Sequence, residues 1–306
     1  MLEIRGLKKN YKKFTALKGI DLKVEKGEIF GFIGPNGAGK TTTMKIACGL
    51  LSPTSGEVYV NGINALQNIR RAKQYIGYMP DFFGVYDNLK VTEYLEFYSS
   101  IYGIKGNERN KMIEDLLELV SLTDKADFFV DSLSRGMKQK LCLARCLVHN
   151  PELLVLDEPA SGMDPRARAD LKRILCTLID MGKTVIISSH ILSELSEVCT
   201  SIGIINNGEI VISGNVEEVT NKVYNNKVLE IEVSDSPDKA ETVLKEIDFV
   251  QDINPIGNKL EVSINGDNEQ IKKLLKLLVI RDVPIITLNK KTQNLEDIFL
   301  KVTKEA

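Results

Sequence analysis

A glycine-rich run near the N-terminus has the residue types and the spacing needed to hold phosphate groups. It extends from Gly34 to Thr42, with Lys40 and Thr41 directly after its last glycine. Glycines let successive backbone N–H groups turn toward a phosphate without Cβ clashes, and a helix starting there adds its positive dipole end. The Lys40 ammonium would reach the β- and γ-phosphates, and the Thr41 hydroxyl would ligate Mg²⁺. The run therefore predicts a nucleoside triphosphate site.

The sequence on both sides of this run matches what a phosphate loop requires. Ile29–Ile33 is apolar and predicts a buried strand, and the pattern from Thr41 to Gly49 predicts a helix. A glycine-rich turn without function is the alternative, but a chance match to the whole motif has odds of roughly one in a hundred. The residues expected to contact the nucleotide here are Gly34, Pro35, Asn36, Gly37, Ala38, Gly39, Lys40, Thr41 and Thr42.

Two carboxylates follow a second apolar strand. Leu153–Asp157 is apolar up to its last residue, and Glu158 comes next. Asp157, where the strand emerges, suits direct or indirect contact with Mg²⁺, whereas Glu158 points differently and can polarise an attacking water. A plain polar turn is the alternative, which the upstream phosphate loop disfavours. We therefore expect Glu158 to act as the catalytic base and Lys40 to support catalysis.

Composition limits the class of protein. The chain has 306 residues, enough for two domains, with 43% hydrophobic and 27% charged residues. The net charge of −2 argues against a partner bound by bulk electrostatics, so no nucleic acid is expected. No apolar run approaches a membrane span, and the first residues resemble a strand, not a signal peptide. The five cysteines form no CxxC pair, so we expect reduced, buried thiols in a cytoplasmic protein.

Parallel-sheet signals and helical signals alternate through the first 215 residues. Strands are predicted at Leu2–Leu7, Leu17–Val24, Gly56–Gly62, Leu153–Asp157, Thr184–Ser188 and the hairpin Ile202–Ser213. Helices are predicted from Thr92, and over Asn107–Val120, Ser134–Val148 and Pro165–Met181. The sequence after Gly214 changes composition, and Asn215–Asn226 predicts a connecting helix and linker. The remainder predicts βαββαβ, the order of a ferredoxin-like domain.

A third motif lies at the start of a predicted helix and selects among nucleotide-binding classes. Leu133-Ser134-Arg135-Gly136-Met137 places a good N-cap, Ser134, before a helix whose free N–H groups point outward. A capped helix without function is the alternative. Together with the phosphate loop and the Leu-Asp-Glu-Pro strand end, it resembles the signature loop of the ATP-binding cassette (ABC) family. The resemblance covers nearly all of residues 1 to about 215, with the motifs in the family's order.

This resemblance implies roles for further residues. Tyr11 stands where the family has its adenine-stacking aromatic, and Ser134 and Gly136 would meet the phosphate. Asp164 belongs to a segment that resembles the loop touching the partner subunit, and His190 resembles the switch histidine that contacts the γ-phosphate. Asp81 stands where the family has a glutamine that helps to bind Mg²⁺. Because Asp accepts but cannot donate hydrogen bonds, its metal role is the weakest of these expectations.

The implied fold is α/β: a RecA-like P-loop NTPase core with an antiparallel β subdomain and an α-helical subdomain, plus a small C-terminal α+β domain. The expected boundaries are 1–215 for the cassette (helical subdomain at about 82–150), 216–226 for the linker and 227–306 for the C-terminal domain. ATP and Mg²⁺ are the implied cofactors. A second ATP-binding subunit, in a homodimer, and integral membrane permease subunits are the implied partners, which places the protein at the inner face of the cell membrane.

The resemblance points most closely to the export-type branch of the family, which includes multidrug, antibiotic and sodium pumps. Tyr78-Met79-Pro80-Asp81, the Leu-Ser-Arg-Gly-Met signature and Asn294–Leu300 carry this assignment. The groove expected to receive a membrane partner lies near Phe82, Phe83, Val85 and Tyr86, although a small aromatic core is the alternative for this segment. A soluble ABC ATPase acting on ribosomes or DNA, a regulator that binds ATP without cleaving it and a P-loop kinase are the competing functions.

Overall fold

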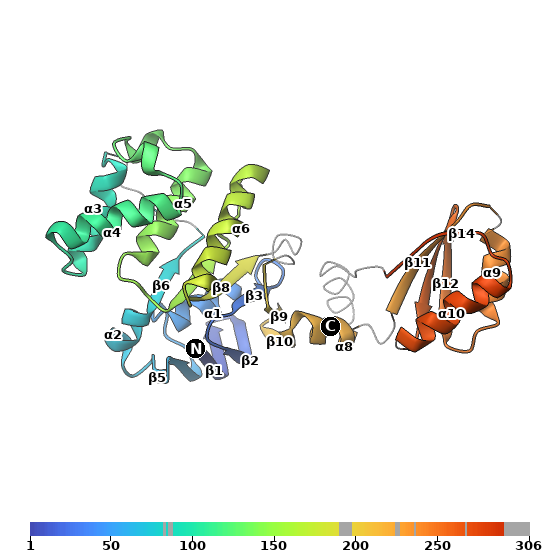
Figure 1. Cartoon of the computed structure of the whole chain (residues 1–306). Helices are drawn as coiled ribbons and strands as arrows, with labels where there is room; N and C mark the ends of the chain where they lie inside the picture. Colours follow the sequence, from blue (N-terminus) through green and yellow to red (C-terminus); the bar gives the residue numbers. More distant parts are fainter. Residues whose placement is uncertain are drawn as a thin grey trace. The chain divides into compact units, whose positions relative to one another are not determined.

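A computed structural model describes residues 1–81, 84, 88–189, 198–223, 227–235, 237–266 and 268–290. The chain divides into two compact units, and the boundary falls between Val216 and Glu217 (Figure 1). The two units are described separately below. His190, Phe82, Phe83, Val85, Tyr86 and Asn294–Leu300 lie outside the described residues.

An antiparallel sheet forms one layer of the first unit. Its strand order is β2-β1-β4-β5, and its strands are β1 (Leu2–Tyr11), β2 (Phe14–Val24), β4 (Ser55–Val60) and β5 (Ile63–Asn64). Leu2, Ile4 and Leu7 of β1 are buried between more exposed residues, as expected for a sheet with one face on the core, and a register shift separates Ile4 from Leu7. Asn61 and Gly62 turn between β4 and β5 with φ of 49° and 76°. This layer is the predicted antiparallel β subdomain.

A six-stranded sheet forms the centre of the unit, in the order β10-β9-β3-β8-β7-β6. All of these pairs are parallel except β10 with β9. The strands are β3 (Ile29–Ile33), β6 (Ile76–Met79), β7 (Leu153–Asp157), β8 (Thr184–Ser189), β9 (Ser201–Asn206) and β10 (Glu209–Asn215). Every residue of β3, β7 and β8 is buried, as strands covered on both faces must be.

The main hydrophobic core lies between the two sheets and includes the helix that follows the phosphate loop. Met44 and Ile46 of α1 (Lys40–Ala47) pack in one cluster with Ile4 of β1 and Phe32 of β3. Because this core fixes β3 and α1 together, the loop that joins them is supported at both ends.

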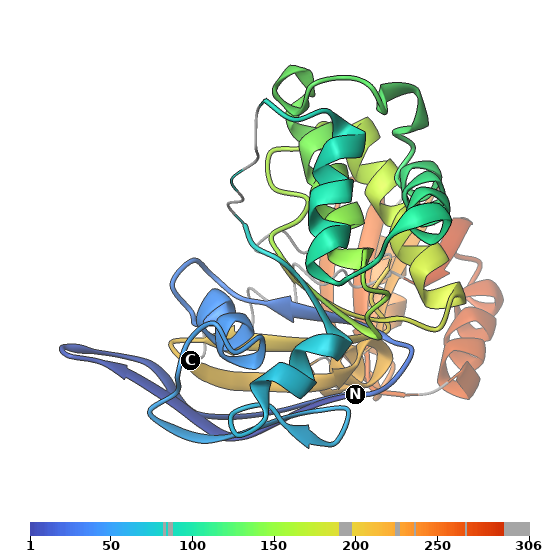
Figure 2. The same ribbon diagram turned by 90° about the vertical axis from the view of Figure 1, so that its left-hand side faces the viewer.

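The helices α3 (Val91–Ile101), α4 (Gly106–Leu119), α5 (Arg135–Leu147) and α6 (Pro165–Asp180) form a group that stands to one side of the sheets (Figure 2). Ser134 caps α5 by accepting a hydrogen bond at Oγ from the Met137 N–H, and the Glu93 carboxylate accepts one from the Lys90 N–H at the start of α3. The helices of this unit after α1 are α2 (Ile69–Ala72), α3 (Val91–Ile101), α4 (Gly106–Leu119), α5 (Arg135–Leu147), α6 (Pro165–Asp180) and α8 (Val216–Val223, which crosses the boundary). Short 3₁₀ turns occupy Lys73–Tyr75, Thr123–Lys125 and Val130–Ser132.

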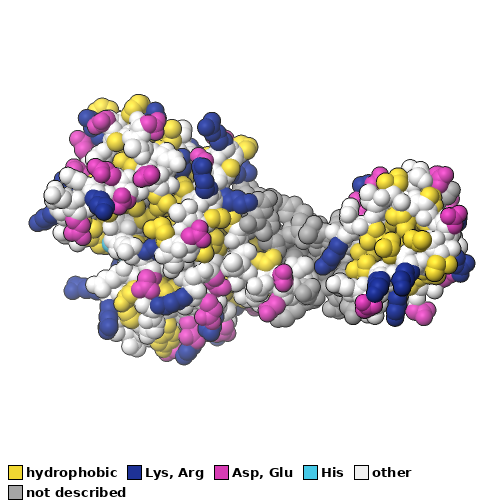
Figure 3. All heavy atoms as spheres, viewed as in Figure 1, with side chains coloured by type: hydrophobic (Ala, Val, Ile, Leu, Met, Phe, Trp, Pro, Cys, Tyr) yellow, Lys and Arg dark blue, Asp and Glu magenta, His cyan; other side chains and the backbone are white. Residues whose placement is uncertain are grey.

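The second unit has the predicted βαββαβ order. Its elements are β11 (Lys227–Val233), α9 (Pro237–Lys245), β12 (Val250–Ile256), β13 (Lys259–Ile264), α10 (Asn268–Ile280) and β14 (Ile285–Lys290). The strand order β12-β13-β11-β14, with all pairs antiparallel, is the ferredoxin-like arrangement. Leu229, Ile231, Leu260 and Val262 form its core with the two helices. Apolar side chains also gather on the face of this unit that Figure 3 shows.

The α/β fold class predicted from the sequence is confirmed, but element lengths and one burial expectation were wrong. β1 extends four residues beyond the predicted end at Leu7, because its pairing with β2 continues to Tyr11 opposite Phe14. The short helix α2 was not predicted. Cys176 is exposed on α6, next to the buried Leu175, so it is not one of the buried thiols.

Candidate functional site

The phosphate loop follows β3 and is held by contacts from two other segments, β2 and the β9–β10 hairpin. Gly39 has φ of 115° and Gly37 has φ of 84°, conformations that L side chains rarely adopt. A Cβ on Gly39 would also lie 2.7 Å from Leu17 Cδ2. The Gly208 N–H, in the β9–β10 turn, donates to the Ala38 carbonyl at 3.0 Å, and the Lys18 N–H donates to the Gly208 carbonyl at 2.9 Å. The loop therefore keeps its shape through its neighbours.

The Lys40 side chain lies inside this loop. It is 6% exposed, and its ammonium donates to the Gly34 carbonyl at 2.6 Å and to the Pro35 carbonyl at 3.4 Å. The ammonium also pairs with Glu158 Oε1 at 3.5 Å. A buried cation is thus aimed at the concave side of the loop and joined to the carboxylate at the end of β7.

Other residues of the loop divide between its interior and its rim. Gly34, Ala38 and Gly39 are buried, whereas Pro35, Asn36 and Gly37 are exposed and Thr41 and Thr42 are half-buried. A Cβ on Gly34 would collide with the Ile205 carbonyl, so only glycine fits there. The exposed backbone of the loop is open to an anion.

The register of the central sheet brings the carboxylates to the loop. Asp157 is paired with Ser188 across β7 and β8, and both strands end at the same edge of the sheet as β3. The Ser188 hydroxyl donates to Asp157 Oδ1 at 2.7 Å and accepts a hydrogen bond from the Glu158 N–H at 2.9 Å. Glu158 has φ of 51°, an unfavourable backbone conformation of the kind that clusters at active sites. Ser188 thus fixes both acidic residues.

Burial raises the pKa of Asp157, while hydrogen bonds from Ser188 and Thr41 oppose the rise and the charge of Asp81 adds to it. Asp157 Oδ2 is buried and, among the described residues, makes no hydrogen bond of normal length and angle. The Thr41 hydroxyl is nevertheless near enough to lower the pKa of Asp157. A buried carboxylate oxygen beside a hydroxyl is a ligand set that Mg²⁺ prefers. Asp81 is exposed, just after the neighbouring strand β6. The residues present fit this ion.

Residues of the signature motif form a second cluster, built around the first turns of α5 and α6. The Gln139 side-chain amide donates to the Ser161 carbonyl at 2.9 Å, and the Ala167 Cβ lies 3.1 Å from where a Cβ on Gly136 would be. Asp164 caps α6 by accepting a hydrogen bond from the Ala167 N–H at 2.8 Å. Ser134 and Asp164 are both exposed.

The two clusters are separate in one chain. Within the described part of the chain, no hydrogen bond or ion pair joins Ser134 or Gly136 to the phosphate loop. Tyr11 is also distant from Lys40 in the sequence and lies at the β1–β2 turn. Its side chain is 45% exposed, and the Lys9 Nζ lies 5.1 Å from the centre of its ring. The structure brings together Lys40, Asp157, Glu158 and Thr41, and leaves Ser134 facing solvent.

Sequence reasoning missed three side chains that shape these clusters: Ser188, Gln139 and Arg135 as a contact of Gly162. Ser188 carried a signal, because a polar residue in a strand that is otherwise apolar must find a partner. Gln139 and Arg135 carried none, since their partners are distant in the sequence.

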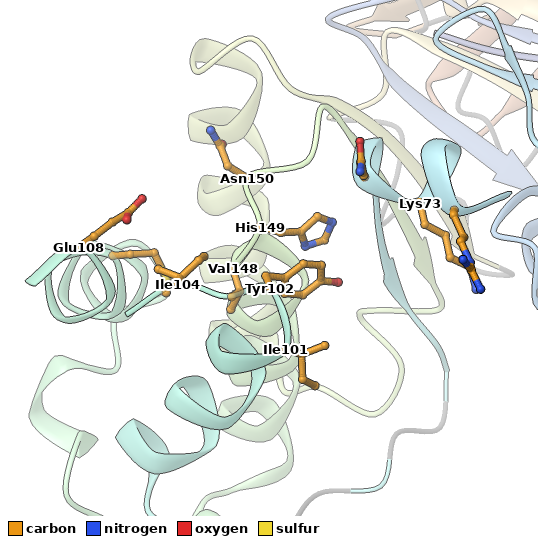
Figure 4. Close-up of a pocket in the computed structure, with 11 residues that line it drawn as sticks. Lys73, Ile101, Tyr102, Ile104, Glu108, Val148, His149 and Asn150 are labelled. Carbon is orange, nitrogen blue, oxygen red and sulfur yellow. The ribbon is translucent and has the colours of Figure 1, made fainter. Parts of the chain in front are cut away.

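A cavity of about 580 Å³ is lined both by α2 with the 3₁₀ turn that follows it and by the helical segments after β6. Its lining combines apolar side chains (Ile101, Ile104, Met112, Val148), the cations Arg70 and Lys73, and the polar residues Gln74, Tyr102, Glu108, His149 and Asn150. The His149 ring stacks on Tyr102 at 4.3 Å, as Figure 4 shows, and its Nε2 lies 3.0 Å from the Ile76 carbonyl of β6. Burial lowers the pKa of His149. No helix among the described residues is long and apolar enough to cross a bilayer.

Comparisons with known proteins agree with this arrangement. Residues 17–161 match the family model described as ABC transporter, and residues 214–303 match the C-terminal domain of DrrA1-3-like ATP-binding proteins. The chain is 32% identical over 305 residues to the linearmycin resistance ATP-binding protein LnrL of Bacillus subtilis (strain 168), covering 99% of this chain and 98% of that one. It is 33% identical over 303 residues to the bacitracin transport ATP-binding protein BcrA of Bacillus licheniformis, covering 99% and 97%.

Solved structures of ATP-binding cassettes resemble about 70% of this chain. The ATP-binding subunit of an ABC transporter superposes with a TM-score of 0.66 at 29% identity, covering 72% of this chain and 92% of that one. The dimeric post-hydrolysis state of the ATP-binding cassette MJ0796 bound to ADP and Pi superposes with a TM-score of 0.65 at 26% identity, covering 71% and 99%.

Proposed function

This chain belongs to the ABC transporter ATP-binding family, and from that premise we propose that Lys40, Asp157 and Glu158 are the centre of the ATPase site that drives export. The chain is an ATP-binding, ATP-hydrolysing subunit of an export system, and such subunits dimerise and pair with membrane permeases. The alternative of a soluble ABC ATPase acting on ribosomes or DNA is not favoured. The proposed domain boundaries are 1–215, 216–226 and 227–306.

Nucleotide binding is assigned to the phosphate loop. The backbone N–H groups of Asn36–Thr42, which include the start of α1, are suited to bind the triphosphate, with the Lys40 ammonium on its terminal phosphates. Tyr11 is proposed to stack on the base, since it is exposed at the end of β1. Mg²⁺, held by Thr41 and Asp157 with help from Asp81, would neutralise phosphate charge.

Hydrolysis is assigned to Glu158. Its carboxylate lies beside Lys40, and its backbone is fixed by Ser188, so it is placed to orient a water and take up its proton. His190 is proposed to contact the terminal phosphate, on the resemblance alone. The observation that carries the proposal is the convergence of Lys40, which follows β3, with Asp157 and Glu158 at the end of β7, on the two sides of the central strand β8.

The exposed signature cluster supports composite sites in a homodimer. Ser134 and Gly136 of one copy are proposed to meet the ATP bound by Lys40 of the other, and Asp164 to lie at the contact between copies. Because each chain then supplies half of a site, hydrolysis requires two copies.

Glu158→Gln tests this proposal most directly. It keeps the size and hydrogen-bonding capacity of the side chain but removes the base, so turnover is expected to fall by about 10²–10⁴-fold while ATP binding survives. Gel filtration with saturating MgATP is expected to show a stable dimer of the variant. Glu152→Gln, at the other end of β7, is the control, because Glu152 is an exposed partner of Lys26. Undiminished turnover of Glu158→Gln, or a monomer under MgATP, would refute the assignment.

The cavity beside His149 is proposed as the docking site of the membrane partner. Its apolar lining with Arg70 and Lys73 suits a short amphipathic helix that carries an acidic residue. The segment first expected to dock, Phe82–Tyr86, lies outside the described residues and stays part of the proposal. This assignment places the protein at the inner face of the membrane.

Ile101→Asp is expected to abolish co-purification of the permease encoded beside this chain, because a charge would be buried in the contact. ATP binding by the isolated chain should not change. Val279→Asp, on the exposed surface of the second unit, is the matched control. Normal co-purification of the Ile101 variant would contradict this docking site.

A further inference from the structure

Tyr78 lies on the edge strand β6, outside the residues assigned to the ATPase site. Its side chain is half-buried, and its hydroxyl oxygen is buried and makes no hydrogen bond with any of the described residues. A buried tyrosine hydroxyl normally has a partner, because an unpaired polar group in the interior is destabilising. The position of this hydroxyl therefore requires an explanation.

The register of β6 on β7 directs this side chain toward the helix that follows the phosphate loop. Tyr78 is paired with Val155, and both pack in the hydrophobic cluster that includes Met44 of α1. Side chains two residues apart on a strand point to the same face, so Asp157 lies on the face of Val155. Tyr78 and Asp157 therefore share the layer between the central sheet and α1.

The Tyr78 hydroxyl is close enough to the Asp157 carboxylate to be affected by its charge. Burial raises the pKa of Tyr78, and among the neighbouring groups Asp157 raises it most, ahead of Cys48 and Asp81. Both effects keep the proton on the hydroxyl. Tyr78 is therefore a hydrogen-bond donor at neutral pH.

Asp157 Oδ2 is an acceptor that lacks such a donor. Ser188 donates to Oδ1 at 2.7 Å, but Oδ2 makes no hydrogen bond of normal length and angle within the described part of the chain. Thr41 is assigned to Mg²⁺ through its hydroxyl oxygen, and Asp81, as a carboxylate, has no proton to donate. A buried donor on Tyr78 and a buried acceptor on Asp157 thus lie in the same layer.

We propose that Tyr78 is a positioning residue for the metal ion. Its hydroxyl donates a hydrogen bond, direct or through water, to the Asp157 carboxylate and holds that carboxylate in the orientation that binds Mg²⁺. The inference rests on the proposed function, in which Asp157 holds the ion. Hydrogen-bond partners of metal ligands orient those ligands, and their removal typically costs about 10–100-fold in metal affinity.

Tyr78→Phe tests this role, because it removes the hydroxyl and retains the ring. The Mg²⁺ concentration for half-maximal ATP hydrolysis by the full-length chain is expected to rise by about 10–100-fold. In calorimetry, the gain in affinity that Mg²⁺ gives to a non-hydrolysable ATP analogue should shrink by a similar factor. Binding of the analogue in EDTA should not change, since Lys40 and the phosphate loop are unaltered.

Tyr94→Phe is the matched control. The Tyr94 side chain is fully buried, but its hydroxyl accepts a hydrogen bond from Arg145 at 3.3 Å. Loss of this bond should lower the melting temperature of the metal-free chain and leave its Mg²⁺ dependence unchanged. Tyr78→Phe should have the opposite pattern, because removal of an unpaired hydroxyl does not destabilise the metal-free chain. A lower melting temperature with unchanged Mg²⁺ dependence would show that Tyr78 only packs the core.

Asp157→Asn separates this inference from the site assignment. It keeps the size of the side chain but removes its charge, so it should strongly reduce the effect of Mg²⁺. Adding Tyr78→Phe should then cause little further loss, because the two groups act as one unit. If Asp157→Asn weakens the Mg²⁺ effect but Tyr78→Phe does not, the positioning role is wrong and the site stands. If Asp157→Asn responds to Mg²⁺ as the wild type does, the site assignment itself has failed.

Discussion

The phosphate-loop cluster and the signature cluster differ in how completely one chain builds them. In the first, Lys40 is 6% exposed and Asp157 is 1% exposed, and both are fixed by bonds to other buried groups. In the second, Ser134 is exposed, and its hydroxyl accepts a hydrogen bond from the Met137 N–H in the first turn of the same helix. The buried, hydrogen-bonded groups are already held in place, whereas the exposed groups are accessible to another molecule. The difference supports the proposal that one chain builds the phosphate-loop half of the site and that a partner copy supplies the signature half.

The largest effect on ATP hydrolysis is expected when two inactive variants, one altered in each cluster, are mixed. Lys40→Ala should disable the phosphate-loop half, and Ser134→Arg should block the signature half, each lowering turnover of its homodimer by about 10³–10⁵-fold. A mixed dimer contains one site in which both halves are intact, so combining the two proteins should restore hydrolysis that neither has alone. Continued inactivity of the mixture, with mixed dimers present, would break the division into two halves.

Ser188→Ala probes the buried half with a smaller effect. Asp157 and the Glu158 backbone lose their shared partner, and hydrogen bonds to charged groups contribute about 1.5–3 kcal/mol. The free energy of unfolding in urea should decrease by about that amount, and kcat should decrease with it. Thr177→Ala removes an exposed hydroxyl that donates to the Arg173 carbonyl and should change stability by less than about 0.5 kcal/mol. Equal effects of the two substitutions would contradict the contrast between buried and exposed clusters.

The smallest effect is expected for His149, which lies two residues after the end of α5. Burial lowers its pKa from the ordinary 6.5, so the unfolded chain binds more protons than the folded one as the pH falls through that value. Stability should therefore be complete above about pH 6.5 and decline below it. His149→Gln retains a donor for the Ile76 carbonyl and should remove this part of the decline in urea titrations between pH 5 and 8. An unchanged pH profile would show that His149 does not cause it.

The parts of the site that could be predicted from the sequence are the local motifs, and the parts that could not are contacts between distant segments. The phosphate loop and the carboxylates at the end of β7 could be predicted because each motif is a short segment. Glycines mark the limits of the loop, and an apolar strand precedes the carboxylates. The hydrogen bond of Ser188 to Asp157 depends on the register of β7 and β8, and the cover of Arg135 on Gly162 depends on helix packing. Neither is encoded by local periodicity. The role of His190 stays a prediction.

The fold could be predicted to a similar extent. The βαββαβ order of the second unit was evident from alternating patterns, whereas the extension of β1 to Tyr11 required knowledge of its partner strand. The exposure of Cys176 was misjudged because Ile174, Leu175 and Leu178 nearby on α6 are apolar, although a helix turns successive residues to different faces.

The Gly208 contact with Ala38 has a consequence for biosynthesis. The ribosome makes the phosphate-binding segment early, but the turn that clasps it emerges only when the first unit is almost finished. A nascent chain therefore completes its nucleotide pocket late, and gene truncations before this turn yield a cassette with an unclasped loop.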